Sequence, residues 1–194
     1  MKLKQKAILA AMFSLSIMAT SSFSYADNKA NNKVTAQQLE QQFQQATQAY
    51  RQGNYHSAFK LFKPLAERGN PTSQYNLGQM YLNGQGVRQD FSLAINWYKK
   101  AAEQGYADAQ YNLALMYENG QGVKQDYAEA IKWYKKAADQ NYAMAQTNLG
   151  TMYALGKGVT ADLSLAKDLA GKGCDNGNQN GCDLYRILNE KGVK

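Results

Sequence analysis

Residues 66–101 read AERGNPTSQYNLGQMYLNGQGVRQDFSLAINWYKKA, and residues 102–137, directly after them, read AEQGYADAQYNLALMYENGQGVKQDYAEAIKWYKKA. The two stretches are identical at 23 of 36 positions. A fixed period of this length is the signature of a repeat protein, in which each unit buries its apolar face against its neighbours. The sequence therefore predicts a stacked array that presents an extended surface to a partner, without identifying that partner.

Each copy has the pattern of a helix hairpin. In the second copy, apolar residues recur at helical spacing from Ala107 to Tyr117, Asn-Gly-Gln-Gly interrupts at 119–122, and helical spacing resumes from Ala130 to Ala137. We name the first helix of each pair A and the second B. Glycines that adopt a positive φ can end helix A, and an aspartate can cap helix B. The three sets are Gly84, Gly86 and Asp90; Gly120, Gly122 and Asp126; and Gly156, Gly158 and Asp162. A phosphate-binding role would need a third glycine and a preceding strand, which this pattern lacks.

These residues resemble the Sel1-like repeat family, a relative of the tetratricopeptide repeats. The resemblance rests on a Leu-Gly/Ala pair in helix A, a Tyr-x-x-Gly-x-Gly-Val loop and an Asp-x-x-x-Ala start of helix B. The pairs are Leu77-Gly78, Leu113-Ala114 and Leu149-Gly150. The resemblance covers roughly residues 36–194 and implies an all-α fold, a right-handed α-solenoid of Sel1-like and tetratricopeptide-like helix hairpins, used in protein–protein interaction.

The first 26 residues have the pattern of a secretory signal peptide. Lys2, Lys4 and Lys6 precede an apolar run at 7–18 that is too short to span a bilayer, and small residues precede the expected cleavage after Ala26. Removal of the three leader lysines takes the formal net charge from +7 to +4. We expect a monomer in the periplasm or secreted, with no stable membrane insertion. Nucleic-acid binding is not expected, because the basic residues are interspersed with acidic ones.

The mature chain is expected to form one array with atypical ends, since terminal repeats cap the stack. A disordered linker is predicted at 27–35, with Thr35 and Gln38 forming a capping box at the start of the first helix. A tetratricopeptide-like hairpin without the Gly-x-Gly-Val insertion follows at 36–69, Sel1-like repeats at 70–173, and a capping helix with a disulfide at 174–194. In the last repeat, Leu169-Ala170 replaces the Trp-Tyr pair of the earlier B helices, which predicts a thinner core there.

Cys174 and Cys182 are the only cysteines of the chain. Their spacing places one near the end of a B helix and the other at the start of the next helix, and in an exported protein we expect a disulfide between them. Closing so short a loop is worth about 2.5 kcal/mol by chain entropy. A redox motif or a zinc site disagrees with this spacing and with the single histidine, His56. The Cys-x7-Cys spacing resembles the cysteine-rich Sel1-like proteins, some of which are linked to binding or slow hydrolysis of β-lactams.

No catalytic residue, metal ligand or cofactor site is predicted. Two Ser-x-x-Lys sequences occur, at 57–60 and 164–167, and this is the nucleophile motif of serine β-lactamases. Neither is followed by a Ser-Asp-Asn or Lys-Thr-Gly element, and an amphipathic helix with scattered serine and lysine produces such matches by chance. A Ser-His-Asp or Cys-His arrangement could use only His56.

The expected binding surface is a set of side chains on the A helices. In the tetratricopeptide pattern the matching asparagine points into the concave groove and can bond the backbone of a ligand, so the resemblance implies this role here. Asparagine donates to and accepts from main chain, and tyrosine gives contact area at low entropic cost. We define the ladder as Tyr75, Asn76, Gln79, Tyr111, Asn112, Leu115, Thr147, Asn148 and Thr151. Alternatively, the asparagines satisfy the backbone of a neighbouring helix and the tyrosines only pack.

The sequence thus favours an exported scaffold or adaptor of the bacterial cell envelope that binds another protein or peptide in the concave groove, and not an enzyme. Two alternatives stay open. One is a periplasmic immunity protein that binds a toxin effector, a role known among Sel1-like repeat proteins. The other is a weak binder or hydrolase of β-lactams or peptidoglycan fragments.

Overall fold

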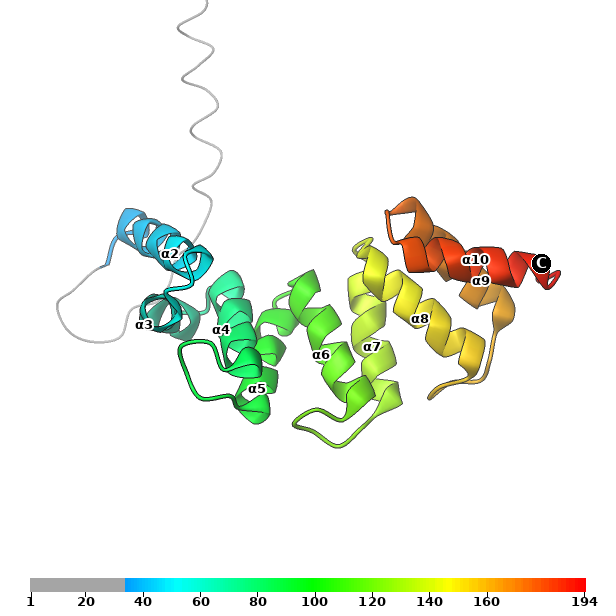
Figure 1. The fold of residues 1–194 in the computed structure, drawn as a ribbon, viewed down its shortest axis with the longest axis horizontal. Coiled ribbons are helices and arrows are strands. Elements are labelled where there is room, and N and C mark those ends of the chain that lie inside the picture. Colours follow the sequence, from blue (N-terminus) through cyan, green and yellow to red (C-terminus); the bar gives the residue numbers. More distant parts are fainter. Residues whose placement is uncertain (1–33) are drawn as a thin grey trace, which may run out of the picture. The chain divides into compact units, whose positions relative to one another are not determined.

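The computed structural model describes residues 34–194, and the regular structure within this range is helical throughout (Figure 1). Residues 1–33, which hold the predicted signal peptide and most of the predicted linker, lie outside the described residues. The described helices are α2 (Ala36–Arg51), α3 (Tyr55–Glu67), α4 (Pro71–Asn83), α5 (Phe91–Glu103), α6 (Ala107–Asn119), α7 (Tyr127–Ala138), α8 (Ala143–Leu155), α9 (Leu163–Asp175) and α10 (Gln179–Glu190).

The chain divides into two compact units, of which the first ends at residue 40 and the second begins at residue 41. In the described part of the first unit, the Thr35 amide donates to Gln38 Oε1 at 2.8 Å and the Gln38 amide donates to Thr35 Oγ1 at 3.2 Å. These reciprocal bonds are the predicted capping box.

The second unit, residues 41–194, contains the repeats. Each helix from α3 to α10 packs against the next one along the chain, so that the A helices (α4, α6, α8 and α10) alternate with the B helices (α3, α5, α7 and α9). This succession of hairpins confirms the predicted all-α solenoid.

The ends of the helices follow the predicted capping chemistry. Gly84, Gly120 and Gly156 end α4, α6 and α8 in the left-handed conformation, with φ of 67°, 68° and 64°. Each B helix after these loops begins at an aspartate whose carboxylate accepts a hydrogen bond from the backbone amide three residues on. The donors and acceptors are Leu93 to Asp90 at 2.9 Å, Glu129 to Asp126 at 3.0 Å and Leu165 to Asp162 at 2.9 Å.

The second glycine of each loop has a packing role that the spacing alone did not predict. A Cβ at Gly86 would overlap the backbone of Tyr55, which starts the preceding B helix. Gly122 lies against Phe91 in the same way, and Gly158 against Tyr127. Because the loop of one repeat presses on the preceding repeat, these glycines are interface residues as well as turn residues.

Two buried apolar clusters form the core. The first joins α2, α3 and α4 around Phe62, Leu77 and Met80, and Trp97 of α5 packs against it. The second runs from α5 to α9 and contains Trp133, which is 4% exposed. Both tryptophans therefore take part in apolar packing that extends over more than one repeat.

Small residues and a disulfide hold the C-terminal end. Leu169 and Ala170 are buried where the earlier B helices carry a tryptophan and a tyrosine. Gly181 of α10 approaches so closely that a Cβ there would lie 2.8 Å from Thr147 Oγ1 of α8. The predicted Cys174–Cys182 disulfide is present and links α9 to α10. No described helix is both long and apolar enough to cross a bilayer.

Candidate binding surface

The ladder residues lie at equivalent positions on α4, α6 and α8. Eight of the nine are half-buried, which leaves part of each side chain accessible. Thr147 is the exception, because it is 5% exposed, donates to the Ala143 carbonyl of its own helix at 3.1 Å, and lies under Gly173 and Gly181. It therefore has little surface to offer a ligand.

In the third repeat, the ladder asparagine takes part in a polar network inside the protein. Asn148 Nδ2 donates to the Tyr134 hydroxyl of α7 at 3.2 Å, and this hydroxyl donates to Glu118 Oε2 of α6 at 2.7 Å. Lys157 Nζ lies 3.7 Å from the other carboxylate oxygen. Burial and the Glu118 carboxylate both raise the pKa of Tyr134, and Asn148 opposes this only in part. Asn148 therefore contributes to the scaffold, although its partner is a side chain and not the backbone.

The second repeat has the same asparagine and tyrosine, but no counterpart of Glu118. Asn112 faces the buried hydroxyl of Tyr98, whose pKa is raised by burial and lowered in part by that amide. The acid is absent because Leu82 stands at the position of Glu118. Within the described range the Tyr98 hydroxyl makes no hydrogen bond of accepted geometry.

The first repeat differs again. The residue fourteen positions before Asn76 is Phe62, where Asn112 and Asn148 have a tyrosine. A phenylalanine ring has no hydroxyl, and the side chain of Asn76 makes no hydrogen bond with any residue of the described range. Next to it, Gln79 Nε2 donates to the Tyr75 hydroxyl at 2.7 Å, which leaves that hydroxyl's own hydrogen without an acceptor in the same range. On α4 the ladder therefore presents unpaired polar groups.

The ladder tyrosines pack against the start of the next A helix. The rings of Tyr75 and Tyr106 are 5.3 Å apart, and those of Tyr111 and Tyr142 are 5.2 Å apart. The Tyr142 hydroxyl also donates to Asp108 Oδ1 at 3.1 Å. The tyrosines thus have the packing role of the alternative interpretation, while remaining only partly buried.

A second set of polar residues, which the sequence analysis missed, holds successive repeats together. Gln74, Gln110 and Gln146 are buried, and each Nε2 donates to the last turn of the preceding B helix: to Ala66 O at 3.1 Å, Ala102 O at 3.0 Å and Ala138 O at 3.2 Å. Each Oε1 accepts from the turn after the following B helix, from Gln104 at 2.7 Å, Gln140 at 2.8 Å and Asn176 at 2.9 Å. Their recurrence every 36 residues was the available signal.

The structure gives the second Ser-x-x-Lys sequence a local partner. Ser164 Oγ donates to the Lys194 carbonyl at 2.9 Å and Lys167 Nζ donates to the Val193 carbonyl at 2.6 Å. Both side chains therefore hold the end of the chain against α9. Ser57 and Lys60 are exposed on α3. Among residues 34–194, no group of three or more His, Cys, Asp or Glu side chains is placed to hold a metal ion.

Comparisons with known proteins agree with this architecture. A model of the Sel1 repeat family matches residues 47–70, 71–106, 107–142 and 143–178. The crystal structure of a Sel1 repeat protein from Oxalobacter formigenes matches with a TM-score of 0.75 and 32% identity, covering 78% of this chain and 62% of that chain. A protective antigen present in uropathogenic Escherichia coli strains, which displays an SLR fold, matches with a TM-score of 0.75 and 37% identity, covering 82% of this chain and 37% of that chain.

The chain therefore spans less than two thirds of the length of both proteins. Cysteine rich protein B of Helicobacter pylori shares the fold, with a TM-score of 0.51 and 21% identity over 79% of this chain and 99% of that one. No curated protein sequence matches the chain.

Proposed function

Because this chain belongs to the Sel1 repeat family, whose solenoids are protein-interaction scaffolds, we propose that it is an exported scaffold of the cell envelope that binds a protein or peptide along the ladder. The predicted leader supports export, and so does the Cys174–Cys182 disulfide, since disulfides persist in oxidising compartments.

The observation that carries the proposal is the unpaired polar cluster on α4. The Asn76 side chain makes no hydrogen bond within the described residues, so its half-buried amide can bond a ligand without breaking an internal bond. An extended peptide backbone offers both a carbonyl for the amide hydrogens and an N–H for the amide oxygen. The available hydrogen of the Tyr75 hydroxyl would add a second donor beside it.

The three asparagines of the ladder differ in how available they are to a ligand. Asn148 is bonded to the Tyr134 hydroxyl and Asn112 faces the Tyr98 hydroxyl, so at both positions a tyrosine hydroxyl would compete with a ligand for the amide. Asn76 has no such competitor. We therefore expect the α4 end of the ladder to contribute hydrogen bonds and the α6 and α8 positions to contribute mainly contact area.

Site-specific photo-crosslinking in living cells tests the proposal. A photo-crosslinking residue replaces Gln79 on α4 in one variant and, as a matched control, Lys99 on helix α5 in another. We expect a discrete protein adduct from position 79 and none from position 99, with both variants exported and melting like the parent. Adducts that form only from position 99, or from neither position, would contradict ligand binding along the ladder.

A further inference from the structure

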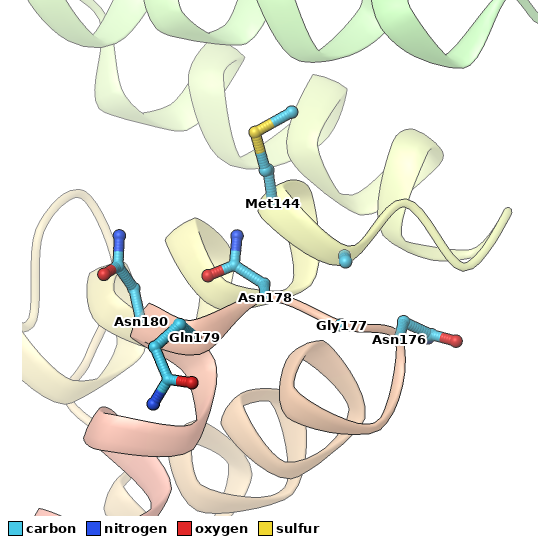
Figure 2. A pocket seen from close by; sticks show the side chains of 7 residues that line it. Met144, Asn176, Gly177, Asn178, Gln179 and Asn180 are labelled. Carbon is cyan, nitrogen blue, oxygen red and sulfur yellow. The ribbon is translucent and has the colours of Figure 1, made fainter.

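An open pocket of about 320 Å³ lies where α8 and α10 begin (Figure 2). It is lined by Ala143, Met144 and residues 176–180. Met144, Asn178 and Asn180 extend toward the same space in Figure 2, whereas Gln179 points away from it. The volume is at the lower end of the range of about 300–1,000 Å³ that is typical of ligand pockets.

The repeats themselves show what normally occupies this position. In the preceding repeat the residues equivalent to Met144 and Asn178 are Asp108 and Tyr142, and the Tyr142 hydroxyl donates to the Asp108 carboxylate. One repeat earlier they are Thr72 and Tyr106, and the Thr72 side chain hydrogen-bonds to the Tyr106 hydroxyl. A tyrosine therefore covers the start of the preceding A helix in two repeats, and the pocket lies where the third repeat lacks it.

The groups that border the vacated position suit an aromatic ring with a polar end. Met144 is 41% exposed, and a thioether makes favourable contacts with the edge of an aromatic ring. The side chain of Asn180 has no hydrogen-bond partner in the described range, and the side chain of Asn178 uses only its Oδ1, which accepts from the Gly181 amide at 3.3 Å. Asn176 and Gln179 are already bonded, to Gln146 and Asp183.

We propose that this pocket binds a tyrosine side chain of the partner, with its ring against Met144 and its hydroxyl bonded by the amides of Asn178 and Asn180. In the two preceding repeats a tyrosine of the same chain covers this position. Here a tyrosine of the partner would cover it. That a partner protein supplies this tyrosine rests on the proposed scaffold function. The preference of the pocket for a phenol ring does not depend on that function.

The probe for this site is N-acetyl-tyrosinamide, titrated into the full-length protein with its methionine methyl groups labelled for NMR. We expect the Met144 methyl signal to shift and to saturate with probe concentration. The methyl signals of Met80, Met116 and Met152 should stay unchanged, because these side chains are buried. N-acetyl-leucinamide serves as the matched control, and we expect it to bind at least about tenfold more weakly.

Asn178→Tyr supplies the decisive variant, since it restores the tyrosine of the earlier repeats. Helices α6 and α8 both begin after a tyrosine at this position, so the fold accommodates it. We expect this variant to lose the saturable shift, and Asn180→Ala to weaken it. A shift of equal size with the leucine probe, a shift that persists in Asn178→Tyr, or no shift at all would overturn the pocket assignment. None of these results would affect the crosslinking test at Gln79, so failure of the pocket and failure of the scaffold function are distinguishable.

Discussion

At the scale of single residues, identical asparagines have different roles because their neighbours differ. Asn76, Asn112 and Asn148 occupy one position of the repeat, and the residue fourteen positions earlier is Phe62, Tyr98 or Tyr134. The sequence shows all six residues, but only the packing of helix A on the preceding helix B shows that Asn112 faces Tyr98 and that Asn148 faces Tyr134. The ladder could therefore be predicted as a set, whereas the difference among its members could not.

Replacement of each of the two buried tyrosines, Tyr98 and Tyr134, by phenylalanine should affect stability differently. Tyr134→Phe removes a hydrogen bond to the Glu118 carboxylate and should lower the free energy of unfolding by about 1.5–3 kcal/mol, the range for bonds to charged groups. Tyr98→Phe removes a buried hydroxyl that has no partner of accepted geometry in the described range, and should leave stability unchanged or slightly raised. Urea unfolding of both variants measures the difference. Equal losses of stability would mean that the Glu118 bond contributes nothing beyond packing.

At the scale of the elements, the sequence predicted what depends on local chemistry. The glycines that end the A helices and the aspartates that begin the B helices were recognisable because each acts within its own turn. The second loop glycine and the buried glutamines were missed because they act between repeats. A glutamine such as Gln110 resembles a surface residue until the carbonyl of Ala102 and the amide of Gln140 are placed beside it.

The turn between α7 and α8 gives a test at this scale. Asn141 adopts a φ of 62°, while Gly69, Gly105 and Gly177 hold the equivalent turns with positive φ. A side chain with Cβ is strained in this region, although asparagine tolerates it better than most residues. We expect Asn141→Ala to lower the free energy of unfolding by about 1 kcal/mol and Asn141→Gly to cause no loss. Thermal melts of the two variants and the parent compare their stabilities. A glycine variant as unstable as the alanine variant would contradict this expectation.

At the scale of the whole molecule, the two apolar clusters predict uneven stability. Trp133 belongs to the cluster of α5 to α9, and Trp97 packs against the cluster of α2 to α4. Trp133→Ala should cost about 3–5 kcal/mol. Because the stability of a solenoid is nearly a sum of repeat and interface terms, we expect hydrogen exchange to accelerate first in α6 to α8, while α3 and α4 stay protected. A uniform loss of protection over residues 41–194 would show instead that the repeats unfold as one unit.

Asn76, which we propose binds the partner, contrasts most sharply with Asn148, which bonds the Tyr134 hydroxyl inside the scaffold. The most direct test compares Asn76→Ala with Asn148→Ala in a binding titration against the crosslinked partner, beside a thermal melt of each variant. Asn76→Ala should weaken binding about two- to tenfold, the equivalent of one hydrogen bond, and leave the melting temperature nearly unchanged. Asn148→Ala should lower stability by about 0.5–1.5 kcal/mol, because the Tyr134 hydroxyl loses its donor but keeps its bond to Glu118, and should leave affinity nearly unchanged for the folded fraction. If Asn76→Ala instead lowers the melting temperature as much as Asn148→Ala does and binds normally when folded, the α4 cluster is part of the scaffold and the account is wrong.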